Sequence, residues 1–401
     1  MKILYVFGGI PPYANAMLNR LVEKNTKVVA VIPARRSKVL GKGVKVIDEK
    51  QAAYRIIDSR EQKTVFGKNY FPDLPDIIER EQPDILVTGW PYFLQFFKYG
   101  RLRKVLRKNG VRFVIREIPF QVPPYGKIRA YFKEHPMYNE DMKLLSWGLP
   151  FYFRQWVTML IRKYCYRRAD GALAYSSLGK AIMPTYGIRE ERVFVTYNTG
   201  DSEALLREKE LLLQKPPILP ENSHRIIHIG RLVKWKKVDL LMDAFAKVLK
   251  EFPDAELVVV GDGPERGSLE RKAKALGIKE RVLFTGGVYD PRTIGAYMSA
   301  SSIYVLAGMG GLSINDAMAY GLPVICSVCD GTERDLVTHH DNGFFFRENN
   351  ADDLFEKISL LLRDTTLRKR MGEASLRVIE EKINLESVSN RYLDAFRKIV
   401  T

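Results

Sequence analysis

The chain has 401 residues, 46% of them hydrophobic, and a formal net charge of +17 from 64 Lys and Arg against 47 Asp and Glu. This length and apolar content exclude a disordered chain and predict two globular domains of about 200 residues each. The three cysteines are too few and too scattered for a disulfide framework. Two of them, Cys326 and Cys329, have the CxxC spacing of zinc and redox sites, but no second ligand pair lies nearby in the sequence.

The N-terminal segment carries one charge and then a buried-strand pattern that ends in Gly8 and Gly9. This pattern predicts a first β-strand and not a signal peptide, so we expect the chain to reside in the cytoplasm. Apolar strands and helical stretches then alternate, which indicates parallel sheets covered by helices on both faces. The strands predicted in the first half are Lys2–Phe7, Lys27–Ile32, Ile85–Thr88, Arg112–Arg116, Gly171–Ala174 and Val193–Thr196.

Much of the positive charge lies in one aromatic segment of the first half. Residues 98–168 hold 17 basic and 4 acidic side chains, and 19 of the 44 aromatic residues lie between Trp90 and Tyr166. Lys and Arg interleaved with aromatic rings suit an anionic lipid surface. A solvated basic helix with ordinary core aromatics is the alternative. The chain has no recognisable helix-turn-helix, zinc-finger or RNA-recognition signature, so we expect no nucleic acid partner.

Two stretches of this segment show the pattern best. Residues 98–108 predict a short cationic helix, and residues 147–161 form an apolar stretch that Arg154 interrupts. A membrane-spanning helix needs about 20 uninterrupted apolar residues, so neither stretch can cross a bilayer. The membrane contact that we expect is therefore peripheral.

The halves of the chain are separated by residues 201–222, which contain a charged helical piece and then the proline-rich run Lys215–Pro220. This composition is typical of a linker. A second alternating series follows, with longer and more regular helices. Its predicted strands are Arg225–Ile229, Glu256–Val260, Val282–Phe284, Ile303–Leu306 and Pro323–Ser327.

The loop after Ile303–Leu306 carries the strongest functional signal. It reads Gly308-Met309-Gly310-Gly311 and leads into a helix with one early carboxylate, Asp316. Backbone N–H groups and the partial positive charge of a helix start favour an anion, and a carboxylate one turn further in can accept ribose hydroxyls. A tight connection within an α/β domain is the alternative.

Three other turns also follow predicted strands. Beyond Arg225–Ile229 lie Arg231 and Lys236, two cations that suit a diphosphate at the carboxyl end of a strand. The turn over residues 261–264 either contacts a ligand or only reverses the chain, and the turn over residues 285–289 could present backbone groups to a base. The recurrence of such turns after consecutive strands indicates one shared ligand site.

Together these motifs resemble the donor-binding domain of retaining glycosyltransferase family 4, from His228 to about Phe346. The first half matches more loosely, through the two glycines after the first strand, residues 168–176 and residues 198–201. The resemblance implies the GT-B architecture of two Rossmann-like α/β domains facing a cleft. The stretches that match in the second half are Gly230-Arg231-Leu232 with Lys236, residues 257–264, residues 284–288 and residues 317–324.

The resemblance also implies a division of the chain. Residues 1–200 would form an N-terminal acceptor-binding domain, residues 201–222 a linker, and residues 223–384 a nucleotide-sugar donor-binding domain. A C-terminal helix, at about residues 385–401, is expected to pack back on the first domain.

Position by position, the resemblance assigns residues to the donor. Arg231 and Lys236 would hold the leaving nucleotide diphosphate, in place of a metal ion. No metal site and no further cofactor are expected. The other assigned groups are the backbone N–H groups of Leu312 and Ser313 at the diphosphate, the Asp316 carboxylate at the ribose, the Val288 backbone at the base, and the loop of Gly8 and Gly9 at the donor phosphates.

Two positions depart from the family pattern. The family usually carries two glutamates eight positions apart in the glycine-rich loop, and here those positions hold Gly308 and Asp316. Recognition of the donor sugar must therefore differ. In the first domain the family often has a histidine near the sugar, and Glu117 stands at the matching position, so we assign it to the catalytic set. An ion pair with Arg112 or Arg116 is the alternative.

From this resemblance we predict a retaining, metal-independent hexosyltransferase that moves a sugar from UDP- or GDP-sugar to a lipid-linked saccharide. It would act in glycan or polysaccharide biosynthesis, in the cytoplasm, as a peripheral protein on the inner face of the cell membrane. His228 lies inside an apolar strand, where we expect a core residue, and no histidine forms a catalytic triad. The departing phosphate itself would therefore help to deprotonate the acceptor. A noncatalytic GT-B subunit that binds nucleotide sugar and a nucleotide-sugar epimerase remain as alternatives.

Overall fold

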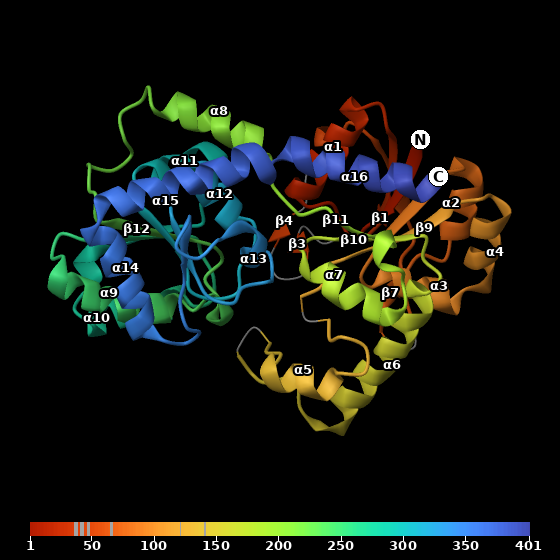
Figure 1. The fold of residues 1–401 in the computed structure, drawn as a ribbon, viewed down its shortest axis with the longest axis horizontal. Helices are drawn as coiled ribbons and strands as arrows, with labels where there is room; N and C mark the ends of the chain where they lie inside the picture. Colours follow the sequence, from red (N-terminus) through yellow and green to blue (C-terminus); the bar gives the residue numbers. More distant parts are fainter. Residues whose placement is uncertain (36–38, 41–43, 46–48, 65–66, 121, 140–141) are drawn as a thin grey trace. The chain divides into compact units, whose positions relative to one another are not determined.

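The computed structural model describes residues 1–35, 39–40, 44–45, 49–64, 67–120, 122–139 and 142–401 (Figure 1). These residues divide into two compact units. Unit 1 comprises Met1–Met137, Leu144–Gly200 and Leu385–Thr401, and unit 2 comprises Tyr138–Lys143 and Asp201–Asn384. Each unit has its own sheet and its own hydrophobic core.

Unit 1 is built on a seven-stranded parallel sheet in the order β11-β10-β9-β8-β1-β2-β5. Its central strands are buried almost throughout, which explains why they appear in the sequence as continuous apolar runs. The strands are β1 (Lys2–Val6), β2 (Lys27–Pro33), β5 (Arg55–Ser59), β8 (Ile85–Gly89), β9 (Arg112–Glu117), β10 (Gly171–Ala174) and β11 (Val193–Val195).

Helices and short turns of helix cover this sheet. The longest, α6 (Gly148–Tyr166), buries Phe151 and Met159 but exposes several large apolar side chains. Two short antiparallel strand pairs, β3–β4 (Val39–Leu40 and Val44–Lys45) and β6–β7 (Gln62–Lys63 and Asn69–Tyr70), lie outside the sheet. The remaining helices of unit 1 are α1 (Pro12–Glu23), α2 (Leu74–Glu81), α3 (Gln95–Lys98), α4 (Gly100–Lys108), α5 (Ile128–Glu134), α7 (Leu178–Ile182) and α16 (Leu385–Val400), with 3₁₀ turns at Glu49–Gln51, Tyr92–Leu94, Met183–Tyr186 and Glu190–Arg192.

The C-terminal helix α16 belongs to unit 1 and lies beside α1, as Figure 1 shows with α16 in blue and α1 in red. An ion pair joins Glu386 to Arg20 at 2.9 Å. On the inner side, the buried Tyr392 hydroxyl accepts a hydrogen bond of 2.9 Å from Arg116 Nε at the end of β9. The last helix of the chain therefore completes the core of the first unit.

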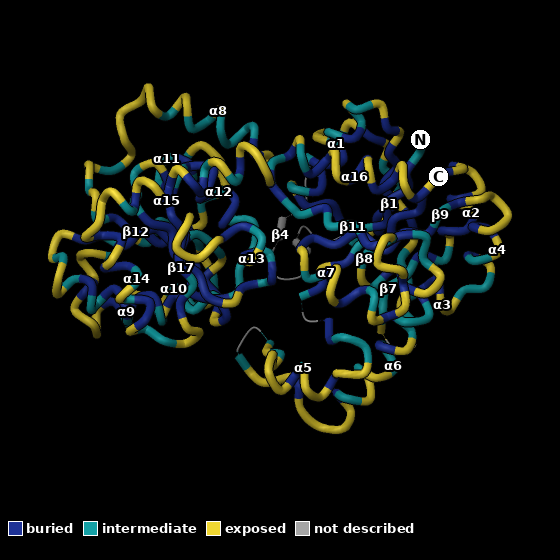
Figure 2. Tube along the Cα trace, viewed as in Figure 1, coloured by how far each residue is buried: buried dark blue, intermediate teal, exposed yellow. Residues whose placement is uncertain are grey.

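Unit 2 is built on a six-stranded parallel sheet in the order β14-β13-β12-β15-β16-β17. Figure 2 draws its central strands in dark blue, as buried. The strands are β12 (Arg225–Ile229), β13 (Glu256–Val260), β14 (Val282–Gly286), β15 (Ile303–Leu306), β16 (Val324–Cys326) and β17 (Gly343–Phe345). The helices are α8 (Ser202–Leu212), α9 (Val238–Glu251), α10 (Arg266–Ala275), α11 (Pro291–Ser299), α12 (Ser313–Ala319), α13 (Glu333–Leu336), α14 (Ala351–Arg363) and α15 (Thr365–Arg377), with shorter helical turns at Lys234–Lys236, Lys279–Arg281 and Val378–Lys382.

Residues 201–222, which we expected to be a linker, fall in unit 2. Their first part is α8, which begins where the Asp201 carboxylate accepts a hydrogen bond from the Ala204 amide at 3.0 Å. The helix packs on α11, where Glu208 pairs with Arg292 at 3.0 Å. These contacts make α8 part of the unit, and the proline-rich residues 216–220 that follow form neither helix nor strand.

All the predicted strands overlap observed ones, so the α/β class with parallel sheets is confirmed. The prediction missed two strands at the sheet edges, β5 and β17. β5 is partly exposed and β17 has only three residues, so neither produces a long apolar run. Among the described residues no helix is long and apolar enough to cross a bilayer.

Candidate functional site

The centre of the candidate site in unit 2 is the pair of adjacent strands β12 and β15. The strands are parallel neighbours, so the turns that follow them leave the same edge of the sheet. The Met309 N–H, in the loop after β15, donates a hydrogen bond of 2.9 Å to the carbonyl oxygen of Trp235, in the turn after β12. This bond brings the glycine-rich loop against the turn that carries Arg231 and Lys236.

Gly308 allows this close approach. A Cβ atom at this position would lie 2.1 Å from the Trp235 carbonyl oxygen and 2.8 Å from the Lys236 carbonyl carbon. Real Cβ atoms essentially never come this close, so no other residue fits without moving the backbone. The missing glutamate therefore reflects a loop that packs backbone against backbone.

The two cations occupy different surroundings in this turn. Arg231 is exposed, whereas Lys236 is partly buried at the end of the 3₁₀ turn Lys234–Lys236. The neighbouring Lys237 pairs with Glu348 at 2.6 Å, so its charge is already matched. Lys236 also lies near the buried imidazole of His228, because its positive charge lowers the pKa of that ring.

His228 is the core residue that its apolar strand predicts. Its side chain is fully buried, and Nδ1 lies 3.0 Å from the Val305 carbonyl oxygen, which requires Nδ1 to carry the proton. Burial and then the positive charge of Lys236 lower the pKa of His228 to about 4. The ring is therefore neutral at physiological pH and supports the sheet beneath the two turns.

The helix α12 carries the predicted ribose ligand. Asp316 lies in the first turn of α12, and burial raises the pKa of its carboxyl to about 7. Within the described part of the chain, no group hydrogen-bonds to this carboxylate, so its oxygens can accept hydroxyl groups. At the start of the helix, the Ser313 hydroxyl receives a hydrogen bond of 2.7 Å from the buried Tyr304.

The predicted amide donors precede Asp316. Over the residues that the structure describes, the backbone N–H groups of Leu312 and Ser313 donate to no backbone carbonyl, as is usual at a helix start. Both residues are partly exposed. The structure therefore leaves two N–H groups at the head of α12 for an anion.

The turn over residues 261–264 packs against the start of the cationic turn. The Leu232 N–H donates to the Asp262 carbonyl at 2.9 Å, and the Glu265 N–H donates back to Leu232 at 3.0 Å. A Cβ at Gly263 would lie 2.3 Å from the Leu232 carbonyl oxygen. These contacts favour the structural interpretation of this turn, which fixes the start of the cationic turn beside it.

Val288, the predicted contact for the base, lies in the loop after β14 and is partly exposed. β14 is separated from β12 by β13. The structure thus places Val288 at the outer end of the same sheet edge, away from the loop after β15.

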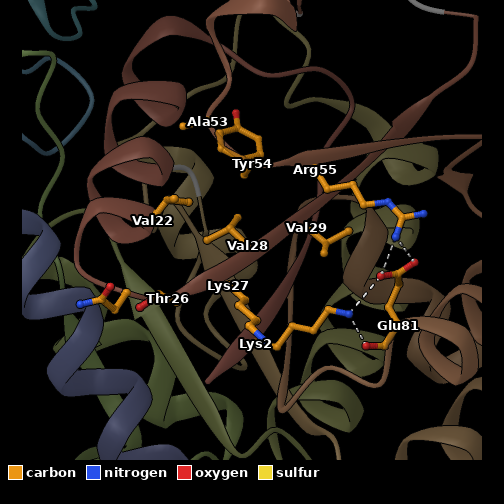
Figure 3. Close-up of a pocket in the computed structure, with 11 residues that line it drawn as sticks. Lys2, Val22, Thr26, Lys27, Val28, Val29, Ala53, Tyr54, Arg55 and Glu81 are labelled. Carbon is orange, nitrogen blue, oxygen red and sulfur yellow. Dashed lines mark hydrogen bonds and ion pairs between the residues drawn. The ribbon is translucent and has the colours of Figure 1, made fainter.

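Two cavities formed by described residues of unit 1 lie at opposite ends of its strands. The smaller, about 480 Å³, lies at the strand starts and is lined by Lys2, Arg55 and Glu81 (Figure 3). There Glu81 pairs with Lys2 at 3.0 Å and with Arg55 at 3.1 Å, so these two cations share one carboxylate. The larger, about 1310 Å³, is lined by residues at the carboxyl ends of β1, β8, β9 and β10. Open α/β sheets bind ligands at the carboxyl ends, which makes the larger cavity the candidate site.

Glu117 lies in the wall of the larger cavity and is nearly buried. Its two carboxylate oxygens accept hydrogen bonds from Arg162, at 2.6 and 3.2 Å, and one also accepts from the Tyr166 hydroxyl at 2.7 Å. The partners we considered, Arg112 and Arg116, were wrong: Arg112 pairs with Asp170 and Arg116 binds a tyrosine of α16. Because both oxygens are engaged, the geometry favours Glu117 as a residue that positions Arg162.

Gly8 and Gly9 follow β1, and Gly8 lines the larger cavity. A Cβ at Gly8 would lie 2.8 Å from the Tyr92 hydroxyl, and Gly9 is buried. The assigned role of this loop at the donor phosphates stays a prediction. In the described ranges, no group of three His, Cys, Asp or Glu side chains could hold a metal ion.

Comparison with known proteins finds similarity in the second unit. Residues 211–378 match the family model "Glycosyl transferases group 1", which spans the cationic turn, the glycine-rich loop and α12. Through these residues, which make up less than half of the chain, unit 2 is similar to the group 1 glycosyl transferases. An uncharacterised glycosyltransferase of Haemophilus influenzae is 32% identical over 182 residues, which are 44% of this chain and 50% of that protein. The N-acetyl-alpha-D-glucosaminyl L-malate synthase of Bacillus anthracis is 29% identical over 199 residues, 49% and 51% of the two chains.

The chain thus spans about half the length of these curated relatives. Among solved structures, HepE of Anabaena in complex with UDP is similar over 98% of this chain and 99% of that one, with a TM-score of 0.72 and 18% identity. This likeness covers both units and confirms the GT-B fold with two Rossmann-like domains.

The sequence did not predict the larger cavity of unit 1. Lys68, Trp90 and Arg162 line it, although they are far apart in the sequence. The excess of basic and aromatic residues in this half was the available signal, and it indicated a surface and not a cavity.

Proposed function

We propose that the protein is a retaining, metal-independent glycosyltransferase. It would move a sugar from a UDP- or GDP-sugar to a saccharide acceptor held near a membrane, in glycan or polysaccharide biosynthesis. The observation that carries the proposal is the hydrogen bond from Met309 to Trp235, because it holds the glycine-rich loop beside Lys236 within the group 1 domain.

In this proposal the donor binds at the carboxyl edge of the unit 2 sheet. Arg231, Lys236 and the amides at the head of α12 stabilise the negative charge that develops on the departing diphosphate. The Asp316 carboxylate accepts hydrogen bonds from the ribose hydroxyls. Ionising this partly buried carboxylate is costly, and hydroxyl donors from the ribose offset part of that cost. The residues of unit 2 thus position the donor and stabilise charge, and the phosphate itself takes the acceptor proton.

The acceptor half of the proposal rests on unit 1. Along α6 an apolar stripe faces solvent, formed by Leu149, Phe153, Trp156 and Leu160, at 78%, 63%, 50% and 38% exposure. Their spacing places them on one face of the helix. A lipid surface would cover such a stripe, and the surrounding basic residues suit anionic headgroups. We therefore propose a lipid-linked acceptor and a peripheral position on the cytoplasmic face of the membrane.

A second candidate is a noncatalytic subunit that binds nucleotide sugar. It is favoured by Gly308, because the backbone approach at this position leaves no room for the glutamate that usually faces the donor sugar.

Turnover of the donor separates these candidates. Purified protein is incubated with a panel of UDP- and GDP-sugars, with and without membrane extract, and free nucleotide and glycosylated product are measured. Transfer that requires the extract supports the proposal. Nucleotide binding without hydrolysis or transfer supports the noncatalytic subunit, and conversion of the donor with no acceptor present indicates an epimerase.

A separate measurement tests the proposed membrane contact. Sedimentation with anionic liposomes at low salt should recover the wild-type protein and less of a Leu149→Ser/Trp156→Ser variant. Leu213→Ser is the matched control, because Leu213 is 78% exposed but lies in unit 2. Wild-type protein that stays in the supernatant would rule out the membrane contact.

A further inference from the structure

The larger cavity of unit 1 carries an excess of positive charge. Its described lining contains five basic side chains and one acidic side chain, Glu117. The Glu117 carboxylate is already bound by Arg162 and Tyr166, so it does not compensate the others. The basic side chains are Lys68, Lys98, Arg116, Arg154 and Arg162.

Two of these cations lie over the ring of Trp90, and a third, Arg154, is close enough to affect one of them. Lys68 Nζ lies 4.9 Å and Arg162 Cζ lies 5.2 Å from the centroid of the Trp90 ring. Burial and then the charges of Arg154 and Arg162 lower the pKa of Lys68, so both arginines repel the Lys68 ammonium group. An anion placed among them would relieve this repulsion.

Lys68 and Arg154 have no compensating carboxylate among the residues that the structure describes. Neither forms an ion pair there, in contrast to Arg162, which is held by Glu117. Lys68 is partly buried and Arg154 is exposed at the cavity wall. The cavity therefore offers two cations whose charge a bound anion would match.

The remaining walls are apolar and lead outward. Aromatic and aliphatic side chains line the cavity, and five of them are also large exposed apolar residues of the surface: Trp90, Phe97, Ile118, Leu145 and Phe153. Phe153 also belongs to the exposed stripe of α6, so the cavity wall continues into that stripe. A purely polar anion would leave these walls in contact with water, whereas an apolar chain would cover them.

We propose that this cavity binds an anionic lipid, with its phosphate or diphosphate against Lys68 and Arg154 and its hydrocarbon chain along the wall that leads to α6. The inference rests on the proposed function, since it names the chemical class of the acceptor: a saccharide joined to a lipid through phosphate.

Binding of a short isoprenyl diphosphate tests this assignment. Farnesyl diphosphate is titrated into the full-length protein by calorimetry, with farnesol and inorganic diphosphate as the two partial probes. We expect farnesyl diphosphate to bind at least about tenfold more tightly than farnesol or inorganic diphosphate. Only farnesyl diphosphate can both pair with the cations and cover the apolar walls. The Lys68→Met/Arg154→Gln variant should raise the Kd for farnesyl diphosphate by about 30-fold or more. Each lost cation would account for a factor of up to about ten.

The control variant Lys63→Met/Arg129→Gln removes two exposed cations outside the cavity lining and should bind like wild type. Thermal unfolding checks that both variants are folded. Equal affinity for farnesol, or no loss in the Lys68/Arg154 variant, would overturn the phosphate assignment. Inorganic diphosphate or glucose 1-phosphate binding as tightly as farnesyl diphosphate would overturn the lipid assignment and indicate a soluble phosphate ligand.

UDP and GDP are titrated into the same preparations. Nucleotide binding without binding of farnesyl diphosphate would overturn this inference and leave the proposed function intact. If wild-type protein neither binds UDP or GDP nor turns over a donor, that result counts against the proposed function, whatever the cavity binds.

Discussion

A Gly308→Ala variant tests whether the loop after β15 depends on an approach that tolerates no side chain. The added methyl group would lie 2.1 Å from the Trp235 carbonyl oxygen and 2.8 Å from the Lys236 carbonyl carbon. Both atoms belong to backbone, so neither can rotate away as the end of a side chain could. The loop must retreat by about 1 Å to restore even a 3.0 Å contact.

The energetic cost follows from this retreat. The hydrogen bond from Met309 to Trp235, now 2.9 Å, would exceed hydrogen-bonding distance. Crowding in a packed region costs about 1–3 kcal/mol, and a lost hydrogen bond costs about 0.5–1.5 kcal/mol. We expect the free energy of unfolding to fall by about 2–4 kcal/mol.

Nucleotide binding should fall as well. The retreat displaces the amides of Leu312 and Ser313, which we assign to the diphosphate, and one hydrogen bond to a charged group contributes about 1.5–3 kcal/mol. The Kd for UDP or GDP should therefore rise by about tenfold or more. Urea unfolding measures the stability, and calorimetry measures the affinity.

Gly311→Ala is the matched control, because a Cβ at Gly311 meets nothing within 4 Å. It adds the same methyl group to the same loop without a collision. If Gly308→Ala unfolds at the same urea concentration as Gly311→Ala and binds nucleotide equally well, the close approach does not shape the loop and the reasoning fails.

Four further predictions concern charged groups. Lys236→Met should raise the Kd for a nucleoside diphosphate by about tenfold or more in calorimetry, and should raise the pKa of His228 in NMR titration, because a nearby cation is removed. The pKa of His228 is about 4 in the folded state and near 6.5 in the unfolded state, so the unfolded chain binds more protons between pH 4 and pH 6.5. The free energy of unfolding therefore falls as the pH drops through this window, by up to about 3 kcal/mol, and His228→Gln should remove that slope in urea titrations. Asp316 acts in the opposite sense: its folded pKa of about 7 exceeds its ordinary value of 3.8, so stability falls as the pH rises between them, and Asp316→Asn should remove this loss. Glu117→Ala should cost about 3–5 kcal/mol in urea unfolding, because it leaves buried Arg162 unpaired, and the double variant with Arg162→Met should recover much of that stability.

Each of these predictions has a contrary outcome. An unchanged Kd in Lys236→Met would remove Lys236 from the diphosphate site. Equal pH slopes in wild type, His228→Gln and Asp316→Asn would show that neither group has the shifted pKa. A Glu117→Gln protein of native stability without turnover would return Glu117 to the reacting groups.

The repeating core of the fold could be predicted from the sequence because its physical cause is local. β1, β8, β12, β13 and β15 are short apolar runs between polar helices, and strands buried on both faces require such runs. Edge strands such as β5 and β17 bury less surface, so their composition gave no comparable signal.

The candidate site in unit 2 could be located because its groups lie at strand ends, where the order of the chain fixes their positions. The partners within the site could not. The sequence shows a glycine at position 308, but only the structure shows that the Trp235 carbonyl excludes a side chain there. Likewise Glu117 and Arg162 are 45 positions apart, and their pairing depends on how α6 crosses β9.

The return of α16 to unit 1 affects the order in which the chain can fold during synthesis. The ribosome completes all of unit 2 before it releases Leu385–Val400, the helix that covers Tyr5 and binds Arg116. Until then the first unit leaves part of its apolar core uncovered, although it was synthesised first. We expect the nascent N-terminal unit to depend on chaperones that hold exposed apolar surface, and to become resistant to proteases only after the last helix docks.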